Sequence, residues 1–70
     1  MNVRELKAEM VRQGKTTEEL CGTLGISKSA WFRKMNGTSQ FDQGEISVLR
    51  SELNLDAQQT ITIFFAENVS

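Results

Sequence analysis

The chain has 70 residues and a formal net charge of −1 at pH 7, with 39% hydrophobic and 24% charged residues. This composition is typical of a globular protein rather than a disordered one, and a chain this short buries about 60% of its unfolded surface around one core. We therefore expect a single domain over residues 1–70. The longest uncharged apolar stretch, residues 61–66, is much shorter than the roughly 20 residues of a membrane span, which predicts a soluble protein.

The cysteine and histidine counts exclude several kinds of chemistry. One cysteine and no histidine rule out an internal disulfide and the ligand spacing of a zinc finger. Histidine is also the commonest general base, and every Ser–His or Cys–His nucleophile pair depends on it. We therefore expect no enzymatic activity, no metal and no cofactor.

The charged residues are distributed unevenly along the chain. Residues 26–41 contain three cations, Lys28, Arg33 and Lys34, and no acid, whereas residues 42–70 contain one cation and five acids. The basic segment predicts one anion-facing surface. The isoelectric point of about 5.3, however, is below the basic values that nucleic-acid-binding domains usually have.

The apolar residues of the N-terminal part recur at helical spacing. Between residues 2 and 13 they predict a helix that Gly14 ends. A second helix begins after Thr16 or Thr17, either of which can cap it, and runs to Leu24 with two acids in its first turn. The chain therefore opens with two helices.

A third, basic helix is expected after a tight turn. Residues 25–27 read Gly-Ile-Ser, in which the glycine can take a positive φ and Ser27 caps a helix over residues 28–36. At 100° per residue this helix places Trp31 and Met35 on one side, which we assign to the core. The second and third helices with their turn form a helix-turn-helix arrangement, in which the second helix of the pair can lie in a DNA major groove.

Two further helices are expected in the acidic part of the chain. Apolar spacing predicts a fourth helix over residues 42–53. Asp56 and Gln59 form a capping box that opens a fifth helix, which runs to about Glu67. Residues 60–65 also have the β propensity of a strand, so helix and strand are both open there.

Residues 17–37, TEELCGTLGISKSAWFRKMNG, resemble the helix-turn-helix core of the lambda-repressor-like family, of the Cro/CI or XRE type. Phe41 downstream is similar to the small temperate-phage regulators of that family, whereas Gly22 and Lys34 depart from its usual pattern. The resemblance implies an all-α, five-helix lambda-repressor-like domain that binds a double-stranded DNA operator sequence-specifically and regulates transcription. It also implies a homodimer on a palindromic operator, in the cytoplasm of a bacterial host cell.

The third helix supplies most of the residues expected to contact DNA. Ser29, Arg33 and Asn36 lie on the side opposite the core, and Phe32 lies on its flank. Lys28, near the start of the helix, can reach a base edge or a phosphate. We assign Lys28, Ser29, Phe32 and Arg33 to base reading. Arg33 matches the O6 and N7 acceptors of guanine, and Phe32 matches the methyl group of thymine. The resemblance implies backbone contacts by Thr17 and Asn36, and we assign Lys34, a cation of the same helix, to the DNA backbone as well.

The apolar residues near the end of the chain predict a protein interface. They offer more apolar surface than one side of a helix can hide. Ile63 lies off the helical face shared by Ile61, Phe64 and Phe65, so we expect its side chain to be exposed. We assign Ile63 and Phe64 to a contact between subunits.

A second function fits the same sequence. The acidic residues 42–70 weaken attraction to phosphate and complement a basic DNA-reading surface on another protein. The alternative is therefore an antirepressor or modulator that binds the DNA-binding domain of a partner phage repressor. The cations of residues 28–34 then form a solvated helix face. The salt dependence of binding to short duplexes separates the two functions, because only DNA binding weakens steeply as salt rises.

Overall fold

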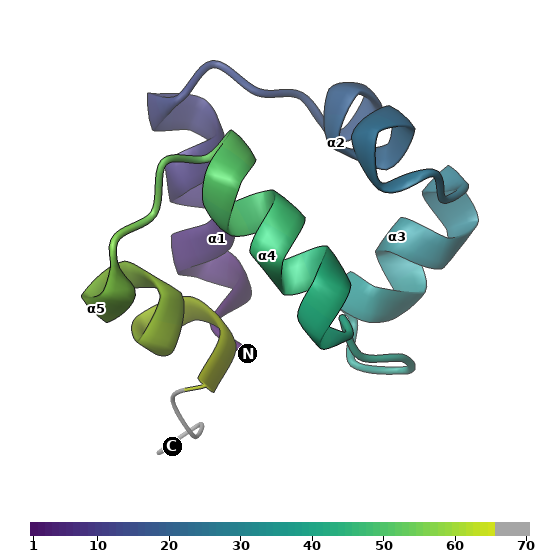
Figure 1. The fold of residues 1–70 in the computed structure, drawn as a ribbon. Coiled ribbons are helices and arrows are strands. Elements are labelled where there is room, and N and C mark those ends of the chain that lie inside the picture. Colours follow the sequence, from purple (N-terminus) through teal and green to yellow (C-terminus); the bar gives the residue numbers. More distant parts are fainter. Residues whose placement is uncertain (66–70) are drawn as a thin grey trace.

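The computed structural model describes residues 1–65, which form helices and the turns that join them (Figure 1). The elements are α1 (Val3–Arg12), α2 (Thr17–Leu24), α3 (Lys28–Met35), α4 (Gln43–Glu52), α5 (Ala57–Thr60) and the π-helical turn η1 (Ile61–Phe65). The all-α prediction is confirmed. The strand alternative for residues 60–65 is wrong, because these residues are helical. The predicted end of the last helix near Glu67 lies outside the described residues.

Each α-helix begins at a side chain that accepts a hydrogen bond from its first turn. The capping residues are Asn2, Thr16, Ser27, Asp42 and Asp56. In α2, α4 and α5 the third helical residue also returns a contact to the amide of the cap, which makes a capping box. Thr16, and not Thr17, therefore caps α2. A cap of this kind is worth about 1 kcal/mol, so local sequence determines where each helix begins.

The turn between α2 and α3 depends on one left-handed residue. Gly25 ends α2 with φ of +70° and ψ of 32°, a conformation that costs glycine little and other residues more. The next amide, that of Ile26, donates to the Cys21 carbonyl at 3.0 Å. An added Cβ at Gly25 would meet no atom within 4 Å, so the requirement for glycine comes from the backbone alone. This turn sets the direction in which α3 leaves α2.

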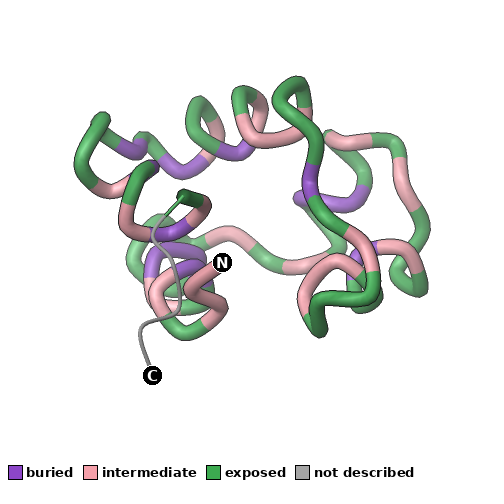
Figure 2. The backbone as a smooth tube through the Cα atoms, turned by 90° about the horizontal axis from the view of Figure 1, so that it is seen from below, coloured by how far each residue is buried: buried purple, intermediate pink, exposed green. Residues whose placement is uncertain are grey.

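The core lies between two groups of helices with α4 in the middle. In Figure 1, α2 and α3 lie on one side of α4, whereas α1 and α5 lie on the other. Helix α4 contacts α2, and α1 contacts η1. Each helix has both buried and exposed positions (Figure 2). The buried apolar residues of the described chain are Leu6, Met10, Leu20, Cys21, Trp31, Phe41, Leu49, Leu53, Leu55 and Ile63.

Three aromatic rings connect α3 to the rest of the core. Trp31 meets Phe41 edge to face, with ring centroids 5.4 Å apart, and Phe41 meets Phe64 in the same way at 6.1 Å. Such pairs stabilise by about 0.5–1.5 kcal/mol beyond the area they bury. Trp31 is buried and Met35 packs against the core, so the assignment of this side of α3 to the core is confirmed.

Ile63 is buried, and its predicted exposure is wrong. Its side chain is 1% exposed, whereas Ile61 and Phe65 are 51% and 58% exposed. The prediction assumed α-helical spacing, but in the π-helical turn η1 each hydrogen bond spans five residues instead of four, which rotates the side chains. The Asn2 amide donates to the Ile63 carbonyl at 2.7 Å and holds η1 against the start of α1.

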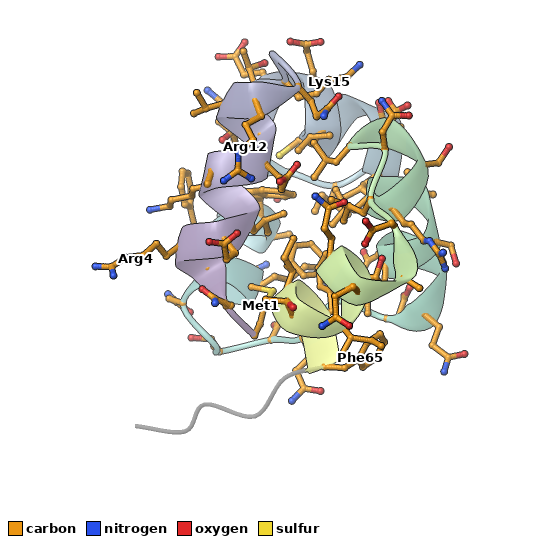
Figure 3. The ribbon with its side chains drawn as sticks, turned by 90° about the vertical axis from the view of Figure 1, so that its left-hand side faces the viewer. Met1, Arg4, Arg12, Lys15 and Phe65 are labelled. Carbon is orange, nitrogen blue, oxygen red and sulfur yellow. The ribbon has the colours of Figure 1, made fainter. Side chains whose placement is uncertain are left out.

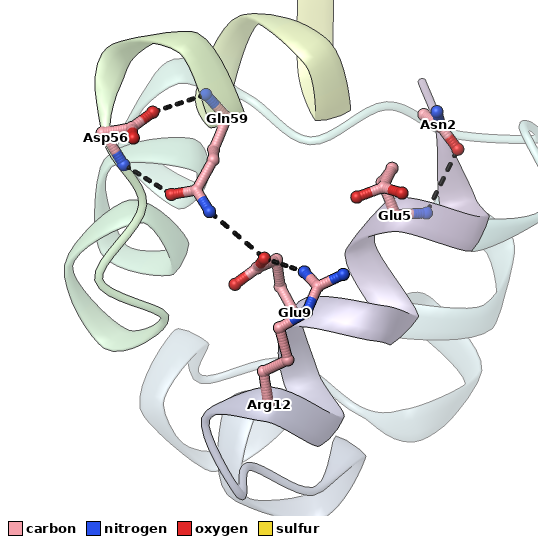
Figure 4. A network of polar contacts seen from close by, with 6 residues as sticks. All are labelled: Asn2, Glu5, Glu9, Arg12, Asp56 and Gln59. Carbon is pink, nitrogen blue, oxygen red and sulfur yellow. Dashed lines mark hydrogen bonds and ion pairs between the residues drawn. The ribbon is translucent and has the colours of Figure 1, made fainter.

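A buried acid connects α1 to α5 (Figure 4). Glu9 is 3% exposed, and its carboxylate forms an ion pair with Arg12. The Gln59 side chain donates to the same carboxylate oxygen at 3.2 Å while its own carbonyl oxygen accepts from the Asp56 amide at 2.9 Å. A buried carboxylate is costly unless it is paired and hydrogen-bonded, and here it is both. The network therefore fixes the position of α5 along α1.

Truncation of Ile63 should destabilise the domain. We expect Ile63→Ala to lower the free energy of unfolding by about 2–5 kcal/mol, because it leaves a cavity in the core. Val11 is also an aliphatic, β-branched residue, but it is 82% exposed on α1, so Val11→Ala should change stability by no more than about 0.5 kcal/mol. Chemical denaturation followed by circular dichroism measures both. Equal effects of the two variants would contradict the burial of Ile63.

Candidate nucleic-acid interface

The exposed side of α3 lies opposite its buried tryptophan. Four side chains form this surface, which we call the α3 face: Lys28, Ser29, Phe32 and Arg33, all of them exposed. Phe32 is 56% exposed, which is unusual for a large aromatic residue in a chain with so few of them. The four residues predicted to read bases are therefore all exposed, and two of them, Lys28 and Phe32, line the same groove.

A groove runs between the start of α2 and the start of α3. It has a volume of about 370 Å³ and is lined by Thr16, Thr17, Glu18, Lys28 and Phe32. The Lys28 ammonium crosses it and donates to a Glu18 carboxylate oxygen at 2.9 Å. The groove therefore joins one residue predicted to contact the DNA backbone, Thr17, to two predicted to read bases.

The ion pair with Lys28 changes the pKa of Glu18. The hydrogen bond from Lys28 and its positive charge lower the pKa of the Glu18 carboxyl below its usual value. Glu18 also lies in the first turn of α2, where a negative charge is favoured by the helix dipole. Both effects keep Glu18 ionised at neutral pH.

The other cations of α3 differ in their surroundings. Among residues 1–65, Arg33 is exposed and forms no ion pair, whereas the Lys34 ammonium donates to Glu45 at 3.0 Å and to the Gln40 carbonyl at 3.2 Å. Lys34 also lies 5.6 Å from the centre of the Phe41 ring, and its side chain is only 16% exposed. Lys34 therefore fastens α3 to α4 and lies beside the α3 face rather than on it.

Asn36 lies at the end of α3, and its side-chain oxygen is hydrogen-bonded to the following turn. Its side-chain oxygen accepts hydrogen bonds from the Thr38 amide at 3.0 Å and from the Thr38 hydroxyl at 2.7 Å. The residue is exposed, and the two N–H donors of its amide point to no acceptor within residues 1–65. Asn36 therefore shapes the loop after α3 and still has donors for a phosphate oxygen.

The residues assigned to a protein interface do not lie together on the surface. Ile63 is in the core, and Phe64 is half-buried against Phe41, so the exposed apolar side chains there are Ile61 and Phe65. Figure 3 places Phe65 at the end of the described chain, on the same side of the molecule as Met1. A groove of about 300 Å³ lies there, lined in part by Met1, Phe64 and Phe65.

Sequence reasoning missed the acids that pair with the basic helix. Glu18 and Glu45 lie 10 and 11 residues from their lysines, on helices other than α3. Helical spacing relates residues three or four apart, so it gave no signal for either pair. The cations of α1 were also not assigned, and Figure 3 shows Arg4 projecting away from the molecule.

Comparison of the chain with family models, with curated proteins and with solved structures gives no match. Within residues 1–65, no three His, Cys, Asp or Glu side chains gather closely enough to hold a metal ion. No helix in that part of the chain is long and apolar enough to cross a bilayer.

Removal of the Lys28 ammonium should raise the pKa of Glu18. We expect Lys28→Gln to return this pKa toward its usual value, whereas Lys7→Gln, which removes a cation from α1, should leave it unchanged. NMR titration of the side-chain carboxyl carbon measures both. The folded-state pKa of Glu18 is lowered, so the pair stabilises the fold above the unfolded-state pKa and this contribution is lost as pH falls through the folded-state value. An unchanged Glu18 pKa in Lys28→Gln would contradict the ion pair.

Proposed function

We propose that this protein is a sequence-specific, double-stranded DNA-binding regulator of transcription with a lambda-repressor-like helix-turn-helix fold of the Cro/CI type. The observation that carries the proposal is the α3 face. Its two cations, its hydroxyl and its aromatic ring are exposed on the helix whose Trp31 the core holds in place. A helix so placed is the element that enters a major groove in helix-turn-helix proteins.

The chemistry of the α3 face fits base edges. Arg33 has the planar donors that bind the two acceptors of guanine, and it forms no ion pair with residues 1–65 that DNA would have to break. Phe32 offers a ring to a thymine methyl group, and Ser29 donates to or accepts from any base. Thr17 and Asn36 flank this surface and are proposed to contact phosphates, which set the position of the helix on the duplex.

A dimer fits the size of the molecule. The chain measures 30 × 25 × 20 Å along its principal axes, whereas successive half-sites on one side of a duplex lie about 34 Å apart. One copy therefore covers one half-site. Two copies that meet through the exposed Ile61 and Phe65 would bury these apolar side chains.

The charge of the α2–α3 surface supports a second candidate function, binding to a partner repressor's DNA-binding domain. Two of the three cations of α3 are already paired with acids, Lys28 with Glu18 and Lys34 with Glu45. A surface with its charges compensated attracts phosphate weakly. Within residues 42–65, Asp42, Glu52 and Asp56 form no ion pair with a described residue, and they complement the basic reading surface of a repressor.

Removal of Arg33 should reduce sequence discrimination without unfolding the domain. We expect Arg33→Ala to lower the affinity for a duplex selected from a random pool by about 1–3 kcal/mol, the worth of a bidentate base contact. Fluorescence anisotropy with selected and scrambled duplexes measures the change. Arg4→Ala removes the same charge from α1, and we expect it to leave the preference for the selected duplex intact. If wild-type protein binds no duplex even at low salt but captures a repressor domain, the second candidate function is correct.

Introduction of a charge at Ile61 should dissociate the dimer. Ile61 is exposed and Ile63 is buried, so Ile61→Lys should shift sedimentation from dimer to monomer with helicity retained. Lysine at the exposed Val11 of α1 is the matched control, since it adds the same charge away from the proposed contact. A wild-type chain that remains monomeric at high micromolar concentration would contradict dimer formation.

A further inference from the structure

We propose that Glu18 determines the selectivity of the α3 face, by holding Lys28 in an ion pair that a base edge tolerates and a phosphate does not. This inference rests on the proposed DNA-binding function. It assigns a role to Glu18, which lines the groove between α2 and α3. An acid at this position opposes the binding of phosphate, so attraction to phosphate alone does not explain it.

The ion pair contributes little to holding the fold together. Its two side chains are 58% and 76% exposed, and exposed pairs of this kind contribute little to stability because water and salt screen them. Neither residue belongs to the buried set, and Ser27 and Thr16 cap the two helices without them. The pair is therefore accessible to an approaching duplex, and the fold does not depend on it.

The position of Glu18 explains how it would discriminate between ligands. Lys28 carries three N–H donors, so its ammonium can keep the contact with Glu18 and still donate to a second acceptor. A guanine edge offers neutral acceptors, which the nearby carboxylate repels only weakly. A phosphate oxygen carries a negative charge, and the Glu18 carboxylate, 2.9 Å from the ammonium, repels it. Glu18 therefore penalises phosphate contacts by Lys28 more than base contacts.

Other features of the groove agree with this role. Phe32 and Thr17 line the same space, so the ion pair lies between a residue proposed to read bases and one proposed to contact the backbone. Arg33, on the same helix, forms no ion pair among the described residues, which leaves its attraction to DNA unopposed. The α3 face thus combines one unopposed cation with one restrained cation.

The test compares two acids of the same helical turn. Glu18→Gln and Glu19→Gln each remove one negative charge near the start of α2, but only Glu18 pairs with Lys28. Glu19 closes the capping box with Thr16, and glutamine can replace glutamate in that role, so both variants should fold. Circular dichroism verifies this before binding is measured.

We expect Glu18→Gln to free one cation for phosphate. The slope of log K against log salt for a scrambled duplex should steepen by about 0.9, which corresponds to roughly eightfold tighter binding at 0.1 M salt relative to a 1 M reference. Affinity for the selected duplex should rise less, so the ratio of selected to scrambled affinity falls. Glu19→Gln should change this ratio by less than twofold, and in a Lys28→Gln background Glu18→Gln should have no further effect.

The outcomes separate this inference from the proposed function. If wild-type protein prefers the selected duplex but Glu18→Gln and Glu19→Gln behave alike, the inference is wrong and the DNA-binding function stands. The inference is also wrong if Glu18→Gln tightens binding to both duplexes equally. If the wild-type protein prefers no duplex, both the function and the inference are overturned.

Discussion

The edge-to-face contact between Trp31 and Phe41 is the interaction on which the orientation of α3 depends. Helix α3 is only eight residues long, too short to be stable alone, and its single fully buried side chain is this tryptophan. Phe41 in turn packs edge to face against Phe64 in η1, so the last part of the described chain supports α3 through Phe41. The α3 face is exposed because its opposite side is held in this way.

Three of the eight cations of the chain are held in ion pairs within residues 1–65. Arg12, Lys28 and Lys34 each pair with an acid from the same or another helix, at increasing distance along the chain. Some of the acidic residues, Glu9, Glu18 and Glu45, therefore neutralise specific cations. A chain with a low isoelectric point can keep a small region in which one arginine acts without a partner.

The features that depend on short-range interactions could be predicted from the sequence. Caps such as Ser27 and Asp56 act within three residues, and helical spacing identified Trp31 as core. The features that depend on contacts between distant residues, or on an unusual helical period, could not be predicted. The burial of Ile63 follows from a π-helical turn, and the pairing of Lys28 with Glu18 follows from the angle between two helices. Neither can be read from local composition, because both arise only after the helices have packed.

The hydrogen bond between the Asn2 amide and the Ile63 carbonyl has a consequence for the order in which the domain assembles during synthesis. A ribosome releases α1 first, yet the backbone group that α1's start requires is made 61 residues later. Contacts at such separation form late, because closing the intervening loop costs entropy before the contact is gained. The helices α2 and α3 are neighbours joined by a three-residue turn, so they can pair earlier. In the nascent chain α2 and α3 should therefore pair before α1 docks against η1.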